Sequence, residues 1–546
     1  MKKRRKVWPM MMLLLTIAVT AAGCGGGSNG NGGGNAAANG GAASSAPEGT
    51  APAADSAKVV SKNGNNLVIG VDANFTTLDP HNISDTNSIT AVRTMYEGLM
   101  GFDENMQLKE VLADSYKISD DGLVYTFTLK EGIKFQDGAE FNAEAVKANL
   151  DRVLDESKSL RMRRSFTKVS KVETPDAKTV VITLSEPYAA LLNKMAMLLI
   201  VSPKALAEGG DIAQKPVGTG PFKFKEWTQG DKLVVEKNAE YWQEGLPKVD
   251  SLTFKPVPEN GARIAMLKTG EADFIYPMPA EQVAGLESDS SVVIDKVDST
   301  IVRYVTLNTM KKPYDDVKIR QAINYAIDKE AYVKVVRSGL GTKLDSTMSP
   351  KTQYYSQQTG YDYDPEKAKQ LLAEAGYPDG FKAEIWGGNE SETVKGMQFF
   401  QQQLALVGID VEVKSMESAT LSDQINSATP EDAAIQMWYV SWSPSSGDAD
   451  GATRGLFSSE MFPPAGSNTA YYKNEQVDQW IAEANKSTDP EKAKTIYADI
   501  QKTIWEEAPW AFMGVDQIVS GKKPYLEGVK VYPDGSINLL NAEVKQ

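Results

Sequence analysis

The stretch Pro216-Val217-Gly218-Thr219-Gly220-Pro221-Phe222 decides the fold of this chain. Two prolines and two glycines within seven residues predict a turn, because proline cannot donate to a strand ladder and glycine has no side chain to pack. We therefore expect the chain to change direction here. The elements on either side of the turn show what it joins.

Strands and helices alternate on both sides of this turn. Residues 66–71 form an almost continuous apolar run, typical of a strand buried on both faces, whereas residues 125–129 alternate like a half-buried strand. Aspartate followed by proline starts two predicted helices, with Asp364 and Asp489 as N-caps. The pattern predicts α/β or α+β lobes. Further predicted elements are helices after Asn142 and Asp316 and across 89–99, and strands over 180–184, 302–307 and 409–413.

The first 24 residues have the pattern of a bacterial lipoprotein leader. Basic residues at 2–6 precede an apolar run over 7–22, which is shorter than the ~20 residues of a membrane-spanning helix. Cys24, the only cysteine, follows small residues as in a lipobox, although Ala21 stands where leucine is usual. We expect a signal peptide over 1–23 and a lipid on Cys24 that anchors the protein to the outer face of the cell membrane. The alternative is an ordinary signal peptide with an incidental cysteine.

Residues 24–64 consist mainly of Gly, Asn, Ala, Ser and Pro, which cannot bury enough apolar surface to offset the entropy of folding. We expect a disordered tether there. About 480 residues remain, which is more than a single hydrophobic core accommodates. The folded part therefore needs more than one lobe.

Composition disfavours several classes of function. Without the five basic residues of the leader, 53 Lys and Arg stand against 72 Asp and Glu, a net charge of −19 that argues against nucleic acid as a partner. With Cys24 as the only thiol, disulfides and thiolate metal sites are excluded. His81 is the only histidine, so there is no His-paired metal centre and only one candidate for a Ser-His-Asp triad. We expect no metal, no cofactor and no catalytic residue.

The order of motifs resembles the extracytoplasmic solute-binding proteins of ABC importers, in the family of peptide- and nickel-binding members (family 5). The resemblance covers about residues 65–535. The motifs that carry it are Phe75-Thr76-Thr77-Leu78-Asp79-Pro80, Met95-Tyr96-Glu97-Gly98-Leu99, Leu112-Ala113-Asp114-Ser115-Tyr116, the 216–222 turn, Thr269-Gly270-Glu271-Ala272-Asp273 and residues 317–327.

This resemblance implies an α/β fold of two hinged lobes, of the class II periplasmic-binding-protein type, with an extra subdomain inserted in the first lobe. It places the inserted subdomain at residues 95–215 and the second lobe at 299–514. The turn at 218–221 is then where the chain returns to the first lobe. The segments of the first lobe are 65–94, 216–298 and 515–546.

The resemblance is stronger to the glutathione-binding members, through residues 132–138, 141–149 and 439–450. It implies that a monomer captures glutathione or a dipeptide by closure of its lobes and presents it to an ABC permease, without acting as an enzyme. Other di- or oligopeptides and a chelated metal remain alternative ligands. A secreted hydrolase with paired carboxylates, and an adhesin or chaperone on the same scaffold, are alternative functions.

The charged ends of such a ligand need partners once they leave water. Arg303, at the start of the second lobe, is the candidate for a ligand carboxylate. Peptide-binding relatives hold the ligand amine with an aspartate three residues after a tryptophan, but here Trp442 is followed by Ser445. Asp448 or Asp450 is then the candidate for the amine. The alternatives are a structural ion pair for Arg303 and solvated or capping roles for the two aspartates.

Aromatic and hydroxyl side chains complete the predicted site. Trp386 and Trp442 are candidate walls for the ligand backbone, with core packing as the alternative. The loop formed by residues 75–80, the early loop, faces the cleft in relatives. The predicted ligand-binding residues are Phe75, Thr76, Thr77, Arg303, Trp386, Trp442, Ser445, Asp448 and Asp450.

Overall fold

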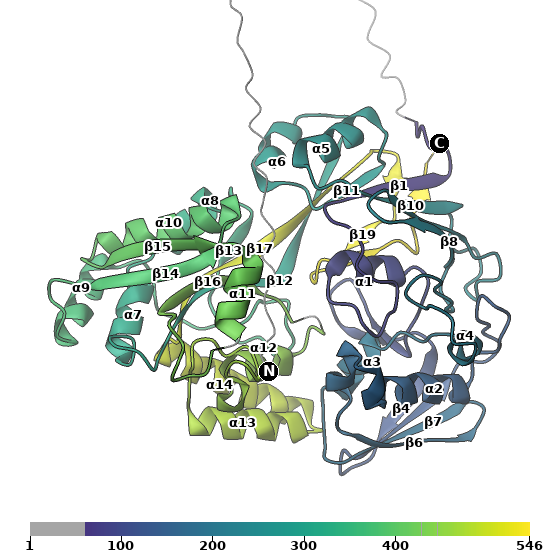
Figure 1. Cartoon of the computed structure of the whole chain (residues 1–546), viewed down its shortest axis with the longest axis horizontal. Helices are drawn as coiled ribbons and strands as arrows, with labels where there is room; N and C mark the ends of the chain where they lie inside the picture. The colour runs from purple at the N-terminus through teal and green to yellow at the C-terminus, as the bar shows by residue number, and fades with distance from the viewer. Residues whose placement is uncertain (1–59, 427, 445, 546) are drawn as a thin grey trace, which may run out of the picture. The chain divides into compact units, whose positions relative to one another are not determined.

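An eleven-stranded sheet and a four-stranded sheet organise residues 60–426, 428–444 and 446–545, which the computed structural model describes (Figure 1). The predicted signal peptide, Cys24 and most of the tether lie outside these residues, as does Ser445. In the large sheet the strand order is β15-β14-β16-β12-β17-β11-β1-β10-β9-β8, and β13 pairs with β17. The strands are β1 (Asn66–Val71), β8 (Phe222–Thr228), β9 (Lys232–Lys237), β10 (Ser251–Pro256), β11 (Phe274–Tyr276), β12 (Val293–Leu307), β13 (Gly341–Lys343), β14 (Lys382–Gly388), β15 (Asp410–Met416), β16 (Met437–Trp442) and β17 (Trp510–Lys522).

Two long antiparallel strands, β12 and β17, carry this sheet from one half to the other. β17 pairs with β11 of one half, and β12 pairs with β16 of the other. The β12–β17 register shifts between Asp298 and Val302. The irregular step contains Ser299, whose hydroxyl donates to the carbonyl of Asp516 at 2.7 Å. The two halves are therefore connected through a ladder that is interrupted at this step and again between Arg303 and Tyr304.

The four-stranded sheet has its own core. Its order is β4-β5-β7-β6, and the helix α2 (Ala143–Leu154) contacts β6 and β7. Asn142 caps α2 by accepting from the N–H of Ala145, as predicted. Phe127, Ile182 and Leu150 are buried in one hydrophobic cluster that includes both the sheet and α2. The strands are β4 (Ala113–Ile118), β5 (Val124–Leu129), β6 (Val169–Asp176) and β7 (Thr179–Leu184).

The 216–222 turn lies against the backbone of Met95 and Tyr96. The N–H of Gly220 donates to the carbonyl of Met95 at 2.9 Å, and a Cβ on Gly218 would lie 2.3 Å from that same oxygen. Glycine is required here because no side chain fits between the two segments. The first residues of the predicted insertion therefore lie beside the segment that follows it.

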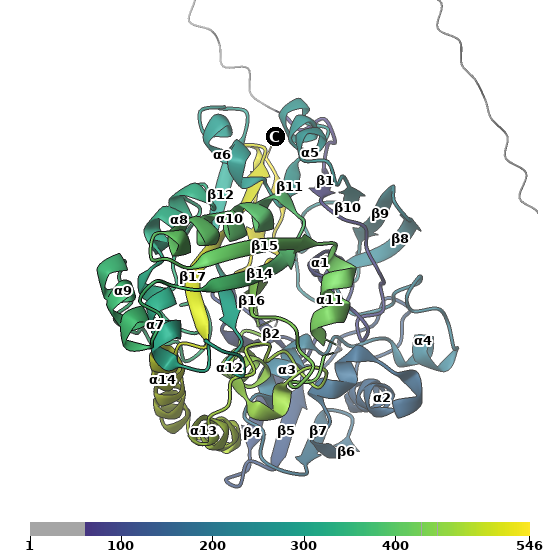
Figure 2. The same cartoon turned by 60° about the vertical axis from the view of Figure 1, so that its left-hand side comes forward.

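Helices cover the second half of the large sheet, and α10 lies over β14, β15 and β16 (Figure 2). Asp316, Asp364 and Asp489 cap their helices, which confirms those predictions. The helices after the turn are α5 (Asn260–Thr269), α6 (Ala280–Leu286), α7 (Val317–Tyr325), α8 (Lys329–Val335), α9 (Pro365–Glu374), α10 (Ser391–Ala405), α11 (Ser418–Asn426), α12 (Ala449–Phe457), α13 (Glu475–Lys486) and α14 (Pro490–Glu507).

The predicted helix across 89–99 was wrong in its bounds. Helix α1 spans Thr86–Val92, and Asp85 caps it through the N–H of Ser88. The apolar residues that follow, Met95 and Leu99, are buried through tertiary contacts rather than by a helical face. The remaining helices are α3 (Leu191–Met197), α4 (Pro203–Ala207) and the 3-10 turns at Glu156–Lys158, Arg161–Ser165 and Ser459–Met461. The short strands are β2 (Met100–Phe102), β3 (Leu108–Glu110), β18 (Leu526–Glu527), β19 (Lys530–Val531), β20 (Ile537–Asn538) and β21 (Glu543–Val544).

Candidate functional site

Arg303 belongs to a cluster of four charged side chains. Its Nε donates to Oδ2 of Asp516 on the neighbouring strand β17 at 2.9 Å. The other oxygen of Asp516 lies 3.0 Å from Nε of Arg337. Glu392 lies 3.2 Å from Nη2 of Arg303 and also accepts a hydrogen bond from Arg337. Two guanidinium groups and two carboxylates thus form a charge-balanced arginine–carboxylate quartet.

A cavity of about 250 Å³ lies beside Arg303. Burial disfavours the charge of Arg303, but the field of Asp516 outweighs it and raises the arginine pKa, so the guanidinium stays charged. A permanently charged, planar donor next to a cavity is suited to binding a carboxylate. The other lining residues are Gly388, Glu390, Thr393, Leu421, Ser422, Trp438, Tyr439, Val440 and Ser441.

The two predicted tryptophan walls differ in their surroundings. Trp442 pairs with Val302 on β12, one register position from Arg303, and its buried indole N–H has no acceptor among the described residues. A buried donor without a partner is rare and costly, so a ligand acceptor at this point would be stabilised. Trp386 is 8% exposed and packs with Leu421 and Ile425. It occupies a core position, whereas Trp442 retains an unsatisfied polar group.

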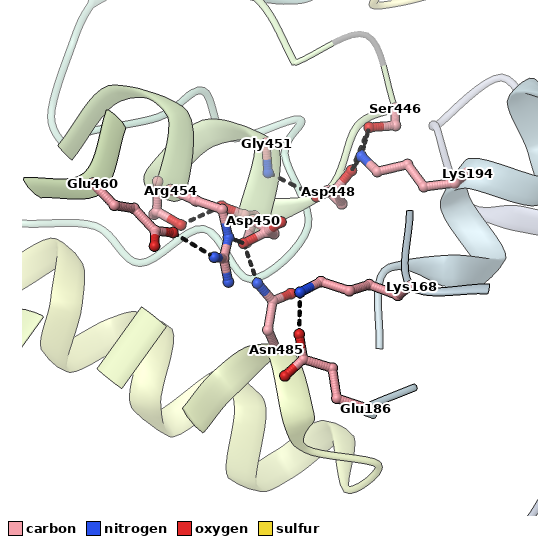
Figure 3. Close-up of polar contacts among 12 residues, drawn as sticks. Lys168, Glu186, Lys194, Ser446, Asp448, Asp450, Gly451, Arg454, Glu460 and Asn485 are labelled. Atoms are coloured by element: carbon pink, nitrogen blue, oxygen red, sulfur yellow. Dashed lines mark hydrogen bonds and ion pairs between the residues drawn. The ribbon is translucent and has the colours of Figure 1, made fainter. Parts of the chain in front are cut away.

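Asp448 is already bound by a lysine. Lys194 of α3 lies 2.9 Å from Oδ2 of Asp448 and donates to the hydroxyl of Ser446 at 2.7 Å (Figure 3). Asp448 also caps α12 through the N–H of Gly451. Burial alone would raise the pKa of Asp448, but the charge of Lys194 and the hydrogen bonds hold it below its usual value. The ammonium group predicted to come from a ligand is thus supplied here by Lys194.

Asp450 is held in the same region by different partners. Arg454 donates to it at 3.0 Å, and the amide of Asn485 also donates to it (Figure 3). Burial raises the pKa of Asp450. A cavity of about 270 Å³ is lined by both aspartates, by Tyr354 and by residues of α3 and β4. Both acids therefore serve contacts inside the protein, and their predicted role toward a ligand amine stays a prediction.

The early loop presents one buried and two accessible side chains. Phe75 is buried and makes an edge-to-face contact with Phe254 at 5.8 Å between ring centres. Thr76 is exposed and donates to Asp85 at 2.6 Å, while the hydroxyl of Thr77 accepts from the N–H of Asp79. These bonds keep the loop in a fixed conformation. Ligand contact by Phe75, Thr76 and Thr77 remains a prediction.

His81 has a structural environment. It is fully buried, Nδ1 accepts from Arg152 at 2.6 Å, and Nε2 donates to the carbonyl of Leu199 at 2.9 Å. Asp79 binds the same arginine through both carboxylate oxygens. The imidazole therefore has both nitrogens occupied by the protein, which is not the environment of a general base.

Metal-binding clusters and membrane-spanning helices are both absent from the part of the chain that the structure describes. Within these ranges, no group of three or more His, Cys, Asp and Glu side chains is arranged to hold a metal ion. Among the same residues, every helix is too short or too polar to cross a membrane.

Four of the charged residues that organise this region were not predicted from the sequence, namely Lys194, Arg337, Glu392 and Asp516. No local sequence motif indicates any of these residues, because the partner of each lies on an element distant in the chain. The nearly continuous apolar run of β17 could have indicated that Asp516, an acid within a buried strand, needs a cation.

Comparison with a family model identifies the family of this chain. The model for bacterial extracellular solute-binding proteins, family 5 (middle region), matches residues 107–464. The chain belongs to this family. Its fold is accordingly the two-lobed α/β fold of family 5.

Relatives within family 5 cover nearly the whole chain. The glutathione-binding protein GsiB of Salmonella typhi is 42% identical over 483 residues, which are 88% of this chain and 94% of GsiB. The ABC transporter substrate-binding protein CtaP of Listeria monocytogenes has a TM-score of 0.81 at 26% identity, covering 89% of this chain and all of CtaP. A dipeptide-binding protein of Pseudoalteromonas, solved with Met-Leu, has a TM-score of 0.74 at 26% identity, covering 88% of this chain and all of that protein.

Proposed function

We propose that this chain is the substrate-binding lipoprotein of an ABC importer and captures glutathione or a similar small peptide between its two lobes. The observation that carries the proposal is the 42% identity to a glutathione-binding protein along almost the full length of both chains. At that identity the scaffold is shared, although ligand choice depends on the site itself.

The cavity beside Arg303 of β12 is suited to an anionic, peptide-like ligand. Arg303 lines a cavity of about 250 Å³ and stays charged. Trp442, whose register partner is the neighbouring Val302, presents its unsatisfied donor on the opposite face of the sheet. Glutathione carries two carboxylates and two amide groups, which suit a guanidinium and buried hydrogen-bond donors. Arg303 is thus our candidate for a ligand carboxylate and Trp442 for a carbonyl oxygen of the ligand backbone.

Closure would occur at the irregular step of β12. The hydroxyl of Ser349 donates to the carbonyl of Ser299, and Thr300 donates to the carbonyl of Pro533 at 3.1 Å. A pairing shift in one strand lets the two halves change their angle with few ladder bonds broken. We accordingly place the inserted subdomain at 95–215, the second lobe at 299–514, and the first lobe in the remainder of 65–546.

The anchor, the partners and the lack of catalysis complete the proposal. Cys24 is the proposed site of lipid attachment on the outer face of the cell membrane, with the chain a monomer that docks on an ABC permease. The ligand leaves chemically unchanged, because closure needs differential binding and no reaction. The closed imidazole environment of His81 supports this part of the proposal.

Calorimetry of the purified full-length protein in detergent tests the function. Glutathione, Met-Leu and Ni²⁺ with free histidine serve as separate titrants. Saturable heat with glutathione, and unchanged glutathione recovered afterwards, are expected. The absence of binding to any titrant, or the release of free amino acids during incubation, would refute the proposal.

A further inference from the structure

Glu392 occupies an unusual position in the arginine–carboxylate quartet. It is the second residue of α10 and contacts both guanidinium groups, yet its side chain is 42% exposed. Asp516, the other carboxylate, is 5% exposed and lies within the central strand β17. One acid is fixed inside the sheet, and the other reaches the same arginines from solvent.

The two acids bind Arg303 with different geometry. Asp516 accepts a directed hydrogen bond from Nε at 2.9 Å. Glu392 forms an ion pair with Nη2 at 3.2 Å, while its directed hydrogen bond comes from Arg337. Solvent weakens the ion pair of the half-exposed Glu392 relative to that of the buried Asp516, whose loss would leave the arginines without a buried counter-ion. Glu392 is therefore the carboxylate that can leave Arg303 at low cost.

The balance of charges in the quartet decides which group can replace Glu392. The quartet has two positive and two negative groups, and the neighbouring cavity is also lined by Glu390. A further carboxylate added beside these acids would meet repulsion. A carboxylate that replaces Glu392 on Arg303 leaves the number of charges at the guanidinium groups unchanged.

We propose that Glu392 holds the place of a ligand carboxylate on Arg303 and Arg337 and is exchanged for it when the ligand enters the cavity. The inference rests on the proposed function and deepens it, because it names the residue that makes binding depend on a free carboxylate. A ligand lacking that carboxylate cannot compensate the arginines that Glu392 would leave.

Replacing Glu392 tests the exchange. Glu392→Gln keeps the size of the side chain and removes the competing charge, so glutathione should bind about tenfold more tightly. The probes are glutathione, its derivative with the glycine carboxylate as carboxamide, and its derivative with the γ-glutamyl α-carboxylate as carboxamide. For the derivative that lacks the entering carboxylate, the gain should vanish, which identifies the carboxylate concerned.

Glu366→Gln is the matched control, because Glu366 is also the second residue of its helix and pairs with Lys369 at 2.9 Å. It should leave all three affinities unchanged. Glu392→Asp, which retains the charge on a shorter side chain, is a second variant and should give a smaller gain.

The outcomes separate the inference from the function on which it rests. If wild type binds glutathione but Glu392→Gln binds it equally or more weakly, or gains equally for all three probes, the exchange is refuted and the function stands. If neither protein binds any probe, the proposed function fails and the exchange with it.

Discussion

The ammonium group of Lys194 lies 2.9 Å from the carboxylate of Asp448, joining α3 to the first turn of α12 across 254 residues of chain. The side chains are 13% and 4% exposed, so the pair is nearly dry. The amide of Asn193, also on α3, donates to the carbonyl of Ser446 in the loop before α12 at 3.0 Å. This contact connects the proposed inserted subdomain to the proposed second lobe, independently of β12 and β17.

Lys194→Met should destabilise the protein, because it leaves Asp448 buried without its counter-ion. Breaking a buried pair costs about 3–5 kcal/mol, whereas replacing both partners costs less. Urea unfolding should show that loss for Lys194→Met and a partial recovery for Lys194→Met with Asp448→Asn. Lys147→Met, which removes an exposed pair with Asp151, is the control and should cost under about 1 kcal/mol. An equal loss of unfolding free energy at the two sites would contradict the exclusion of solvent from the Lys194–Asp448 pair.

Arg303→Ala should weaken glutathione binding by about 10- to 100-fold, because a charge-assisted hydrogen bond to the ligand is lost. The free energy of unfolding should also fall, since Asp516 loses one of its two arginines. Titration calorimetry at a temperature where the variant stays folded separates the two effects. Arg161→Ala, at an exposed arginine, should bind like wild type. Unchanged affinity in Arg303→Ala would exclude it as the carboxylate partner.

His81 should titrate far below an ordinary histidine. Burial, followed by the charge of Arg152, lowers its pKa from 6.5 to about 4. Because the pKa is lower in the folded protein, the unfolded chain takes up the proton at a higher pH than the folded protein does. Stability is therefore lost as pH falls from about 6.5 toward 4. This loss is about 2 kcal/mol between pH 7 and pH 5. Because His81 is the only histidine, one imidazole signal in NMR spectra of the untagged protein measures it. A midpoint near 6.5 would show an accessible ring.

Lys329 should make stability rise with pH above neutrality. It is buried, its ammonium lies 5.3 Å from the ring centre of Tyr361 and donates to that residue's carbonyl, and burial lowers its pKa to about 7. The folded protein releases this proton near pH 7, whereas the unfolded chain keeps it to about pH 10.5. Stability therefore increases between these values.

Between pH 7 and pH 9, wild type should gain about 2 kcal/mol relative to Lys329→Met, which has no amine. Denaturant unfolding at both pH values gives the difference. Lys334→Met, on the same helix α8, is the control and should parallel wild type. Parallel pH profiles of wild type and Lys329→Met would contradict the lowered pKa.

Gly220→Ala should disturb the contact with Met95. A Cβ there would lie 2.5 Å from the carbonyl carbon of Met95, and both sides of the contact are backbone. Such overpacking costs about 1–3 kcal/mol. Gly455→Ala, at a helical position with no atom within 4 Å, should be neutral or slightly stabilising. Thermal unfolding of both variants measures the contrast, and equal melting temperatures would mean that the turn can move away from Met95.

Local patterns predicted much of the fold correctly. Strands at 66–71, 125–129, 180–184 and 302–307, and helices after Asn142, Asp364 and Asp489, are all present. Each depends on a short-range cause: alternation of apolar residues, an N-cap, or proline at the first helical turn. The helix across 89–99 was misplaced because buried residues outside a helix can imitate its apolar face.

The sequence by itself determined the α/β architecture, the family and the location of the turn, because these follow from periodicity, caps and ordered motifs along one continuous chain. Only the tertiary structure decided which charges face one another. Lys194 with Asp448, and Arg303 with Asp516, Glu392 and Arg337, come from separate elements. Electrostatic pairing depends on distance and burial in space, and neither is encoded by the spacing of residues in sequence.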